Sequence, residues 1–157
     1  MTWLDDLTDD ERTRLRPTPM PRSIDPMLAT LARGGIGASG PGPGEWVYER
    51  KYDGQRVVAY CDGADVRLRS RTDKPADGAY PEIVDALHER VHSDCILDGE
   101  VVAFDGDRPS FSRLQGRMGQ HDPVLSRRSD ISVTYYVFYL LHLDGIDVTG
   151  LGLRRRK

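Results

Sequence analysis

The sequence predicts an α+β protein with a largely antiparallel sheet, and three observations support this fold class. Strand-like and helix-like stretches mix along the chain without the regular alternation that a parallel β-α-β sheet requires. Several β-rich stretches are separated by short turns that contain glycine, such as Asp62-Gly63. Hydrophobic residues make up 38% and charged residues 30% of the 157 residues, the balance of a globular domain with a hydrophobic core.

The N-terminal region predicts a short helix followed by an extended arm. Thr8 and Glu11 have the spacing of a capping box, which opens a helix that Pro17 would end. The stretch Arg16–Gly44 is rich in proline and glycine and is typical of an arm or linker. Within it, the small apolar patch at residues 26–29 can dock on a neighbouring surface. We therefore treat residues 1–25 as a helix and arm that precede the main domain, residues 26–157.

Hydrophobic alternation and β-branched residues predict five strands in the main domain. In the third of them, Val66 and Leu68 alternate with arginines, as in a half-buried antiparallel sheet. Turns at residues 105–107 and 144–145 end the last two. The predicted strands are Trp46–Tyr52, Gln55–Cys61, Asp65–Arg71, Cys95–Phe104 and Ile131–Leu143.

Two helices are predicted between these strands. Pro81–Val91 has proline in its first turn and one apolar stripe formed by Ile83, Val84, Leu87 and Val91. Phe111–Met118 predicts a second, short helix.

Composition argues against several classes of protein. No apolar run is long enough to span a bilayer, and the acidic N-terminus is unlike a signal peptide. We therefore expect a cytoplasmic protein that does not bind a membrane. A net charge of −3 is unusual for a stand-alone DNA-binding domain. Cys61 and Cys95 have no metal-binding spacing and predict buried, reduced thiols. His88 and His92 lack a third ligand, so no metal site is predicted.

The strongest chemical motif is Glu49-Arg50-Lys51-Tyr52-Asp53-Gly54-Gln55-Arg56. A lysine amine attacks phosphorus only when it is unprotonated, and the flanking cations Arg50 and Arg56 disfavour its protonated form. Taken alone, the same residues also fit a solvated hairpin turn.

Two further segments carry candidate site residues. Leu97-Asp98-Gly99-Glu100 places carboxylates at a strand, where one could hold a ribose hydroxyl or Mg²⁺ beside a triphosphate. Phe138, in the aromatic run 135–139, could stack on a purine, although alone it also fits an ordinary core position.

In this order and spacing, the segments resemble the covalent nucleotidyltransferases: DNA ligases, RNA ligases and capping enzymes. KYDGQR resembles the family motif KxDGxR, and ERK its ligase form. SRT at residues 70–72, LDGEVVAF and YYVFYLLHLDG resemble the following motifs, and PML at residues 26–28 resembles the segment before the core. The likeness is strongest to bacterial ligases of the end-joining type and covers most of Pro26–Leu153.

The resemblance implies a partial ligase-type nucleotidyltransferase domain, similar to ATP-grasp folds, that acts in DNA repair. Lys51 would attack the α-phosphate of ATP and carry AMP, with Mg²⁺ or another divalent cation as cofactor. AMP would pass to the 5′-phosphate of a nick in duplex DNA, which the 3′-hydroxyl then seals. Glu49 would select adenine, Phe138 would stack on it, Arg56 and Glu100 would hold the ribose, and Arg71 would lie near the phosphate or the DNA end.

Two features depart from the family pattern. Tyr139 stands where the family usually has aspartate after the stacking phenylalanine. In addition, no EGxx or KxK motif and no oligonucleotide-binding (OB-fold) domain is present in the sequence, so we expect the chain to be incomplete as a ligase, or to be completed by a second chain.

Three interpretations remain open at this point. The first is the ligase just described. The second is a non-catalytic or complementation-dependent fragment that binds a nucleotide or a partner. The third is an RNA ligase or capping-type enzyme, against which Glu49, the SRT segment and the PML arm argue. The basic groups at Arg127-Arg128 and Arg154–Lys157 fit a solvated loop and a solvated tail.

Overall fold

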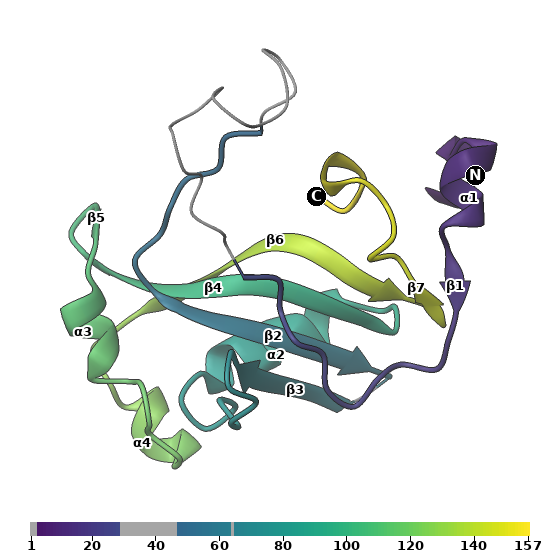
Figure 1. Ribbon diagram of the computed structural model, residues 1–157. Helices are drawn as coiled ribbons and strands as arrows, with labels where there is room; N and C mark the ends of the chain where they lie inside the picture. Colours follow the sequence, from purple (N-terminus) through teal and green to yellow (C-terminus); the bar gives the residue numbers. More distant parts are fainter. Residues whose placement is uncertain (1–2, 29–46, 64) are drawn as a thin grey trace.

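The computed structural model describes residues 3–28, 47–63 and 65–157. Its centre is one antiparallel sheet in the order β1-β7-β6-β4-β2-β3, with β5 paired to β4 (Figure 1). The strands are β1 (Arg16–Pro17), β2 (Gln55–Asp62), β3 (Asp65–Ser70), β4 (Cys95–Asp105), β5 (Arg108–Pro109), β6 (Val133–Leu143) and β7 (Ile146–Asp147). Every strand pairing is antiparallel, which confirms the predicted α+β class with antiparallel sheets.

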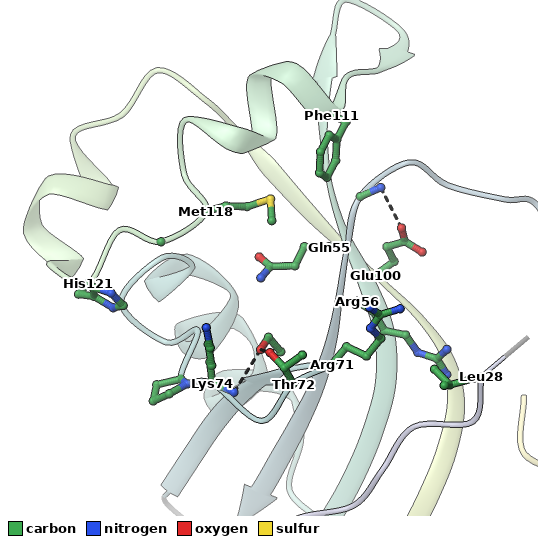
Figure 2. A pocket seen from close by; sticks show the side chains of 14 residues that line it. Leu28, Gln55, Arg56, Arg71, Thr72, Lys74, Glu100, Phe111, Met118 and His121 are labelled. Atoms are coloured by element: carbon green, nitrogen blue, oxygen red, sulfur yellow. Dashed lines mark hydrogen bonds between the residues drawn. The ribbon is translucent and has the colours of Figure 1, made fainter.

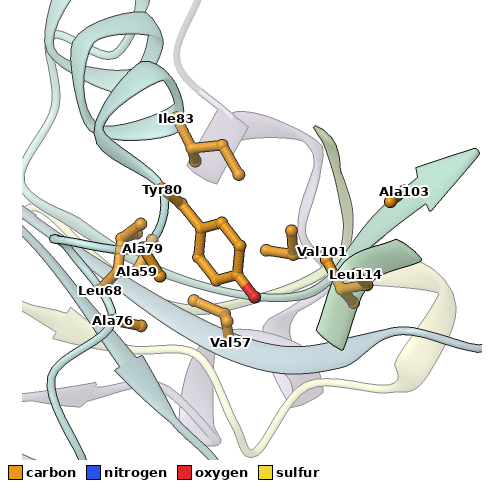
Figure 3. Packing of buried hydrophobic residues seen from close by; sticks show 10 residues of the cluster. All are labelled: Val57, Ala59, Leu68, Ala76, Ala79, Tyr80, Ile83, Val101, Ala103 and Leu114. Atoms are coloured by element: carbon orange, nitrogen blue, oxygen red, sulfur yellow. The ribbon is translucent and has the colours of Figure 1, made fainter. Parts of the chain in front are cut away.

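One face of this sheet packs on helices, and we call it the helix face. It is covered by α2 (Pro81–Arg90) and α3 (Phe111–Gln115), with α4 (Pro123–Arg127) packed against α2. A cluster of buried apolar residues fills the space between these helices and the sheet. Figure 3 shows them grouped around the Tyr80 ring, with Leu114 of α3 at one side. The stripe predicted for α2 is confirmed for Ile83, which is buried in this cluster, and for Val84 and Leu87, which pack against it. Its fourth residue, Val91, lies beyond the end of the helix. Arg117, almost fully buried, donates to the backbone oxygens of Ala79 and Ile131 and so ties the loops around this core together.

The opposite face is covered by segments from both ends of the chain, and we call it the site face. Val58, Tyr60 and Ile96 form its apolar part, against which Met20 and Ile24 of the arm and Leu153 of the tail pack. The Ile24 amide donates to the Tyr60 hydroxyl at 2.9 Å. Figure 1 shows the arm crossing in front of β2 to β4, with α2 behind them.

The N-terminal helix α1 (Asp9–Thr13) has the predicted capping box, with Thr8 as N-cap and Glu11 at the third position. The helix ends before Pro17, which instead lies in β1 and pairs with β7. A 3₁₀ turn at Trp3–Asp6 precedes the helix, and a second one, Leu153–Arg155, lies in the tail. Of the predicted docking patch, Pro26 is buried, Met27 and Leu28 are exposed, and Ala29 lies outside the described residues, as do residues 29–44 of the predicted linker.

One predicted strand is wrong. Trp46 lies outside the described residues, and Val47–Tyr52 forms no strand. Alternation of apolar and polar residues suggested a strand, but these side chains find separate partners: the Tyr52 ring stacks on Tyr136 with centroids 4.2 Å apart, and Glu49 bonds Tyr139. The predicted helix Phe111–Met118 is shorter than expected and continues as turns after Gln115.

Candidate functional site

The candidate site lies where the Lys51 segment enters β2. Residues two apart on a strand share a face, so Arg56, Val58 and Tyr60 all lie on the site face. Arg56 is directly opposite Glu100 of β4, and Val58 is opposite Asp98. This register brings Arg56, the last residue of KYDGQR, next to the two carboxylates of LDGE, 42 and 44 residues later in the chain.

Arg56 and Asp98 form the central ion pair of the site. The guanidinium donates through Nε to Oδ1 at 2.9 Å and through Nη2 to Oδ2 at 2.5 Å. The Asp98 side chain is 1% exposed, and Arg56 also donates to the Met27 carbonyl at 2.7 Å. The hydrogen bonds from Arg56 to Asp98 raise the pKa of Arg56 despite its partial burial. The pair therefore fixes the guanidinium and anchors the end of the arm beside it.

Sequence reasoning missed Asp98 as a member of the site. It read LDGE as a pair of carboxylates at a strand and selected Glu100 alone. The available signal was the position of Asp98 two residues before Glu100, which places both carboxylates on one face of a strand.

Glu100 and Gly54 form a second fixed point. The Gly54 amide donates to Glu100 Oε1 at 2.8 Å. A Cβ at position 54 would lie 2.2 Å from the Val101 carbonyl oxygen, so only glycine lets the chain pass this close to β4. Close packing against β4 thus explains why KYDGQR has glycine at this position. The second carboxylate oxygen of Glu100, Oε2, has no hydrogen-bond partner among the described residues.

A cavity of about 840 Å³ opens at this end of the sheet (Figure 2). Arg56, Arg71, Lys74 and Glu100 contribute its charged groups. Phe111 and Met118 contribute apolar surface, and Gly54, Gln55, Thr72 and His121 are among the other lining residues. Cations outnumber carboxylates in the lining, and the Arg71 guanidinium has no carboxylate partner among the described residues. Such a cavity suits an anionic ligand with an apolar part.

Lys51 is exposed and precedes the cavity by three residues without lining it. Its neighbours are fixed: Tyr52 stacks on Tyr136, and the Arg50 guanidinium lies 5.5 Å from the centre of the Tyr52 ring. No hydrogen bond or ion pair of the Lys51 amine occurs within the described ranges.

Glu49 also lies outside the cavity lining, with both oxygens engaged. Tyr139 donates its hydroxyl to Oε2 at 2.5 Å, and the Lys157 amine lies 2.7 Å from Oε1. Burial opposes ionisation of Glu49, but the hydrogen bonds from Lys157 and Tyr139 outweigh it and lower its pKa. Burial, with the hydrogen bond to Glu49, raises the pKa of Tyr139 to about 12, so Tyr139 is the donor in this pair at neutral pH.

Phe138 occupies a β-bulge rather than an ordinary strand position. Asp98 pairs with Tyr139 and Gly99 with Val137, which leaves Phe138 without a partner on β4. Its half-buried ring packs in the apolar cluster of the site face and lies 5.9 Å from the Arg56 guanidinium. The structure thus brings Arg56, Arg71 and Glu100 to one cavity. Lys51, Glu49 and Phe138 lie outside its lining.

The donor set fits a nucleotide better than a metal held by protein alone. Among the described residues no cluster of three or more His, Cys, Asp or Glu side chains could hold a metal ion. His88 lies in the last turn of α2, and His92 lies beyond the end of that helix. Arg56 occupies both oxygens of Asp98, so the free oxygen of Glu100 is the carboxylate that could share a divalent cation with phosphates. Cys61 and Cys95 are buried, free thiols, as predicted.

Comparisons with known proteins agree with the motifs. The profile described as "ATP dependent DNA ligase domain" matches residues 26–157. A DNA ligase of Natronomonas pharaonis is 37% identical over 137 residues, covering 83% of this chain and 24% of that protein. The multifunctional non-homologous end joining DNA repair protein LigD of Mycobacterium tuberculosis is 33% identical over 137 residues, covering 86% of this chain and 16% of that protein. The chain therefore spans about a quarter or less of these relatives.

Two solved structures are similar in fold. The ligase domain of M. tuberculosis LigD has a TM-score of 0.57 at 32% identity, over 69% of this chain and 33% of that one. A mycobacterial DNA ligase D complexed with ATP and MES has a TM-score of 0.50 at 34% identity, over 62% of this chain and 29% of that one. No helix in the described part of the chain is long and apolar enough to cross a membrane.

Proposed function

This chain belongs to the ATP-dependent DNA ligase family, and we propose that it performs the first step of ligation, the transfer of AMP from ATP to Lys51. One observation carries the proposal. KYDGQR leads directly into β2, so Gly54 and Arg56 line a cavity that also holds Arg71, Lys74 and Glu100, with Lys51 just before it.

The proposed reaction is an in-line substitution at phosphorus. The unprotonated Lys51 amine attacks the α-phosphate, the new P–N bond forms, and the P–O bond to pyrophosphate breaks. Pyrophosphate leaves with the electron pair of that bond, and the attacking amine releases a proton. Positive charge around the phosphates stabilises the transition state, and Arg71 and Lys74 can supply it together with a divalent cation such as Mg²⁺.

The cavity supports a division of roles among the predicted residues. Arg56, held rigidly by Asp98, and Glu100, held by the Gly54 amide, can fix a ribose through its hydroxyls. Phe138 can stack on the base, and Glu49 can accept a hydrogen bond from its amino group. Glu49 and Phe138 lie outside the cavity lining. We propose that the base extends past Arg56 to reach them, while the ribose and phosphates occupy the cavity.

A later step on DNA is part of the same proposal. Activated AMP would move to the 5′-phosphate of nicked duplex DNA, and the 3′-hydroxyl would then displace it. Arg71, exposed at the cavity, is the residue we assign to the DNA end. The chain spans 24% of the Natronomonas pharaonis ligase and 16% of LigD, and we propose that sealing also uses a second chain.

A second candidate function is nucleotide binding without transfer. The observation that favours it is the position of Lys51 outside the cavity, with Glu49 already bonded to Lys157. Transfer requires the Lys51 amine to reach the nucleotide and the base to displace Lys157 from Glu49, whereas binding at Arg56 and Glu100 requires neither.

The deciding experiment is the intact mass of the purified chain after incubation with ATP and Mg²⁺. We expect a gain of one AMP, lost in Lys51→Ala and retained in Lys74→Ala at a lower rate. Peptide mapping assigns the site, because Lys51, Lys74 and Lys157 are the only lysines of the sequence. A folded wild-type chain that binds ATP but gains no mass would leave the binding function in place of the transferase.

A further inference from the structure

Tyr139 stands at the position where the resembling family usually has aspartate, and its environment here is specific. The ring is 7% exposed and packs in the apolar cluster of the site face with Val58 and Ile96. The Phe138 ring meets it edge-on with centroids 5.7 Å apart, and the Arg156 guanidinium lies 5.4 Å from its centre. Tyr139 is thus held on several sides and has little freedom to move.

The hydroxyl of this fixed ring reaches Glu49, 90 residues earlier in the chain, at 2.5 Å. The other donor to Glu49 is Lys157, which is much less buried than Tyr139. The Lys157 side chain is 39% exposed and that of Glu49 is 33% exposed, so water reaches this ion pair and weakens it. Tyr139 is therefore the donor that determines where the carboxylate points, and Lys157 is the donor that a ligand can displace.

The β-bulge at Phe138 explains how two adjacent residues of β6, Phe138 and Tyr139, lie on the same face of the sheet. Because Phe138 is the extra residue on β6, it and Tyr139 pack in the same cluster although they are adjacent in sequence. Tyr139 lies opposite Asp98, the partner of Arg56. The base-stacking residue, the ribose-binding arginine and the donor to Glu49 are consequently held by one rigid part of the sheet.

We propose that Tyr139 is a positioning residue that aims the Glu49 carboxylate and so sets the preference for adenine over guanine. The inference rests on the proposed function, in which Glu49 reads the base. A carboxylate has about four acceptor positions, so Glu49 can take a hydrogen bond from Tyr139 and another from an exocyclic amino group. Adenine offers an amino group at that position. Guanine offers a carbonyl oxygen, which a fixed carboxylate repels.

The test is Tyr139→Phe, which removes one hydroxyl and keeps the ring in its cluster. The matched control is Tyr136→Phe on the same strand, whose hydroxyl has no hydrogen bond among the described residues. The first readout needs no nucleotide: the Glu49 side-chain carboxyl is titrated by ¹³C NMR in each chain. Loss of the donor is expected to raise the pKa of Glu49 in Tyr139→Phe and leave it unchanged in Tyr136→Phe.

The second readout is the affinity for ATP and for GTP, each with Mg²⁺, and the rate of AMP or GMP attachment. We expect Tyr139→Phe to lose about tenfold in preference for ATP over GTP, the change that follows from one lost orienting hydrogen bond. The loss is expected in binding more than in the attachment rate at saturation. Rigid stacking by Phe138 should be retained, so binding of both nucleotides persists.

The outcomes separate the two proposals. A wild-type chain that binds no nucleotide overturns the proposed function, whatever Glu49 does in the titration. A Tyr139→Phe chain that titrates and discriminates like the wild type overturns the role of Tyr139 and leaves the proposed function intact. A raised pKa of Glu49 with unchanged discrimination also overturns it, because the hydrogen bond would then be structural alone.

Discussion

The two faces of the central sheet are held by different kinds of interaction. The buried cluster of the helix face is apolar, with the guanidinium of Arg117 packed over its Tyr80 ring, and its helices α2 and α3 come from segments next to the strands that they cover. The site face combines an apolar patch with the Arg56–Asp98 pair, and its cover comes from the arm and the tail, more than a hundred residues apart. The larger apolar core thus lies on one side of the strands and the Arg56–Asp98 pair on the other, and the cavity opens at their end, where Phe111 and Met118 of the helix face meet Arg56 and Glu100. Val57 and Val101 belong to one side, and Arg56 and Glu100 to the other.

The largest expected effect is on the helix face. Ile83→Ala removes a buried side chain between α2 and the sheet and should lower the free energy of unfolding by about 3 kcal/mol, as deletions of this kind do. Urea unfolding measures the loss. Nucleotide affinity per folded molecule should stay as in the wild type, because Ile83 does not line the cavity. A parallel loss of affinity would show that the two faces are coupled, and the comparison would fail.

The helix face is also the part that the sequence predicted well. On this face the alternation in β3 and the apolar stripe of α2 from Ile83 to Leu87 were confirmed, and so was the capping box of α1 outside it, because these patterns depend on neighbours one to four residues away. Strand β1 was missed, since its pairing with β7 joins residues 129 and 131 apart and leaves no local pattern. The two-residue strands β5 and β7 were also missed, although each pairs with the preceding strand across a turn that the sequence predicted. Helix α4 was also missed, although Asp122-Pro123 offered a cap and a first turn.

The site face was predicted in its residue types but not in its contacts. KYDGQR and LDGE named Arg56 and Glu100, and the structure places both at one cavity. It could not be read from the sequence that Asp98 holds Arg56 or that Tyr139 reaches Glu49, because these pairs depend on strand register and on a bulge. The same lack of local information made Val47–Tyr52 look like a strand.

A smaller effect on stability, with a larger effect on function, is expected on the site face. Asp98→Asn keeps the shape of the side chain but removes its charge and one acceptor for Arg56, which should cost about 2 kcal/mol. Because Arg56 then loses its fixed orientation, ATP affinity should fall at least about tenfold. Asp65→Asn is the matched control: its pair with Arg67 is exposed, so its effect should stay within about 0.5 kcal/mol. Equal effects of the two variants would mean that burial of Asp98 contributes nothing.

The smallest expected effect tests how the cover of the site face is attached. Glu11 accepts hydrogen bonds from the Thr8 amide and from Arg155, and in that order these lower its pKa from 4.5 to about 2. A carboxylate whose pKa is lower in the folded state stabilises that state at any pH above its pKa in the unfolded chain. This contribution is lost as the pH falls from 4.5 toward 2. Glu11→Gln should therefore slightly lower the urea concentration at the midpoint of unfolding at pH 7. The difference in midpoint from the wild type should shrink below pH 4.5. Asp10→Asn, which alters an exposed pair with Arg14 inside α1, controls for the change in charge.

The position of Glu11 makes this last comparison informative about the tail. Arg155 belongs to the segment whose Leu153 packs on the site face and whose Lys157 reaches Glu49. If α1 holds the tail in place, Glu11→Gln should also speed amide exchange at Leu140, whose N–H donates to the Arg156 carbonyl at 2.7 Å. Exchange on the helix face, at Val57 for example, should not change. Faster exchange at both positions would show that the tail contributes to the whole sheet rather than to one face.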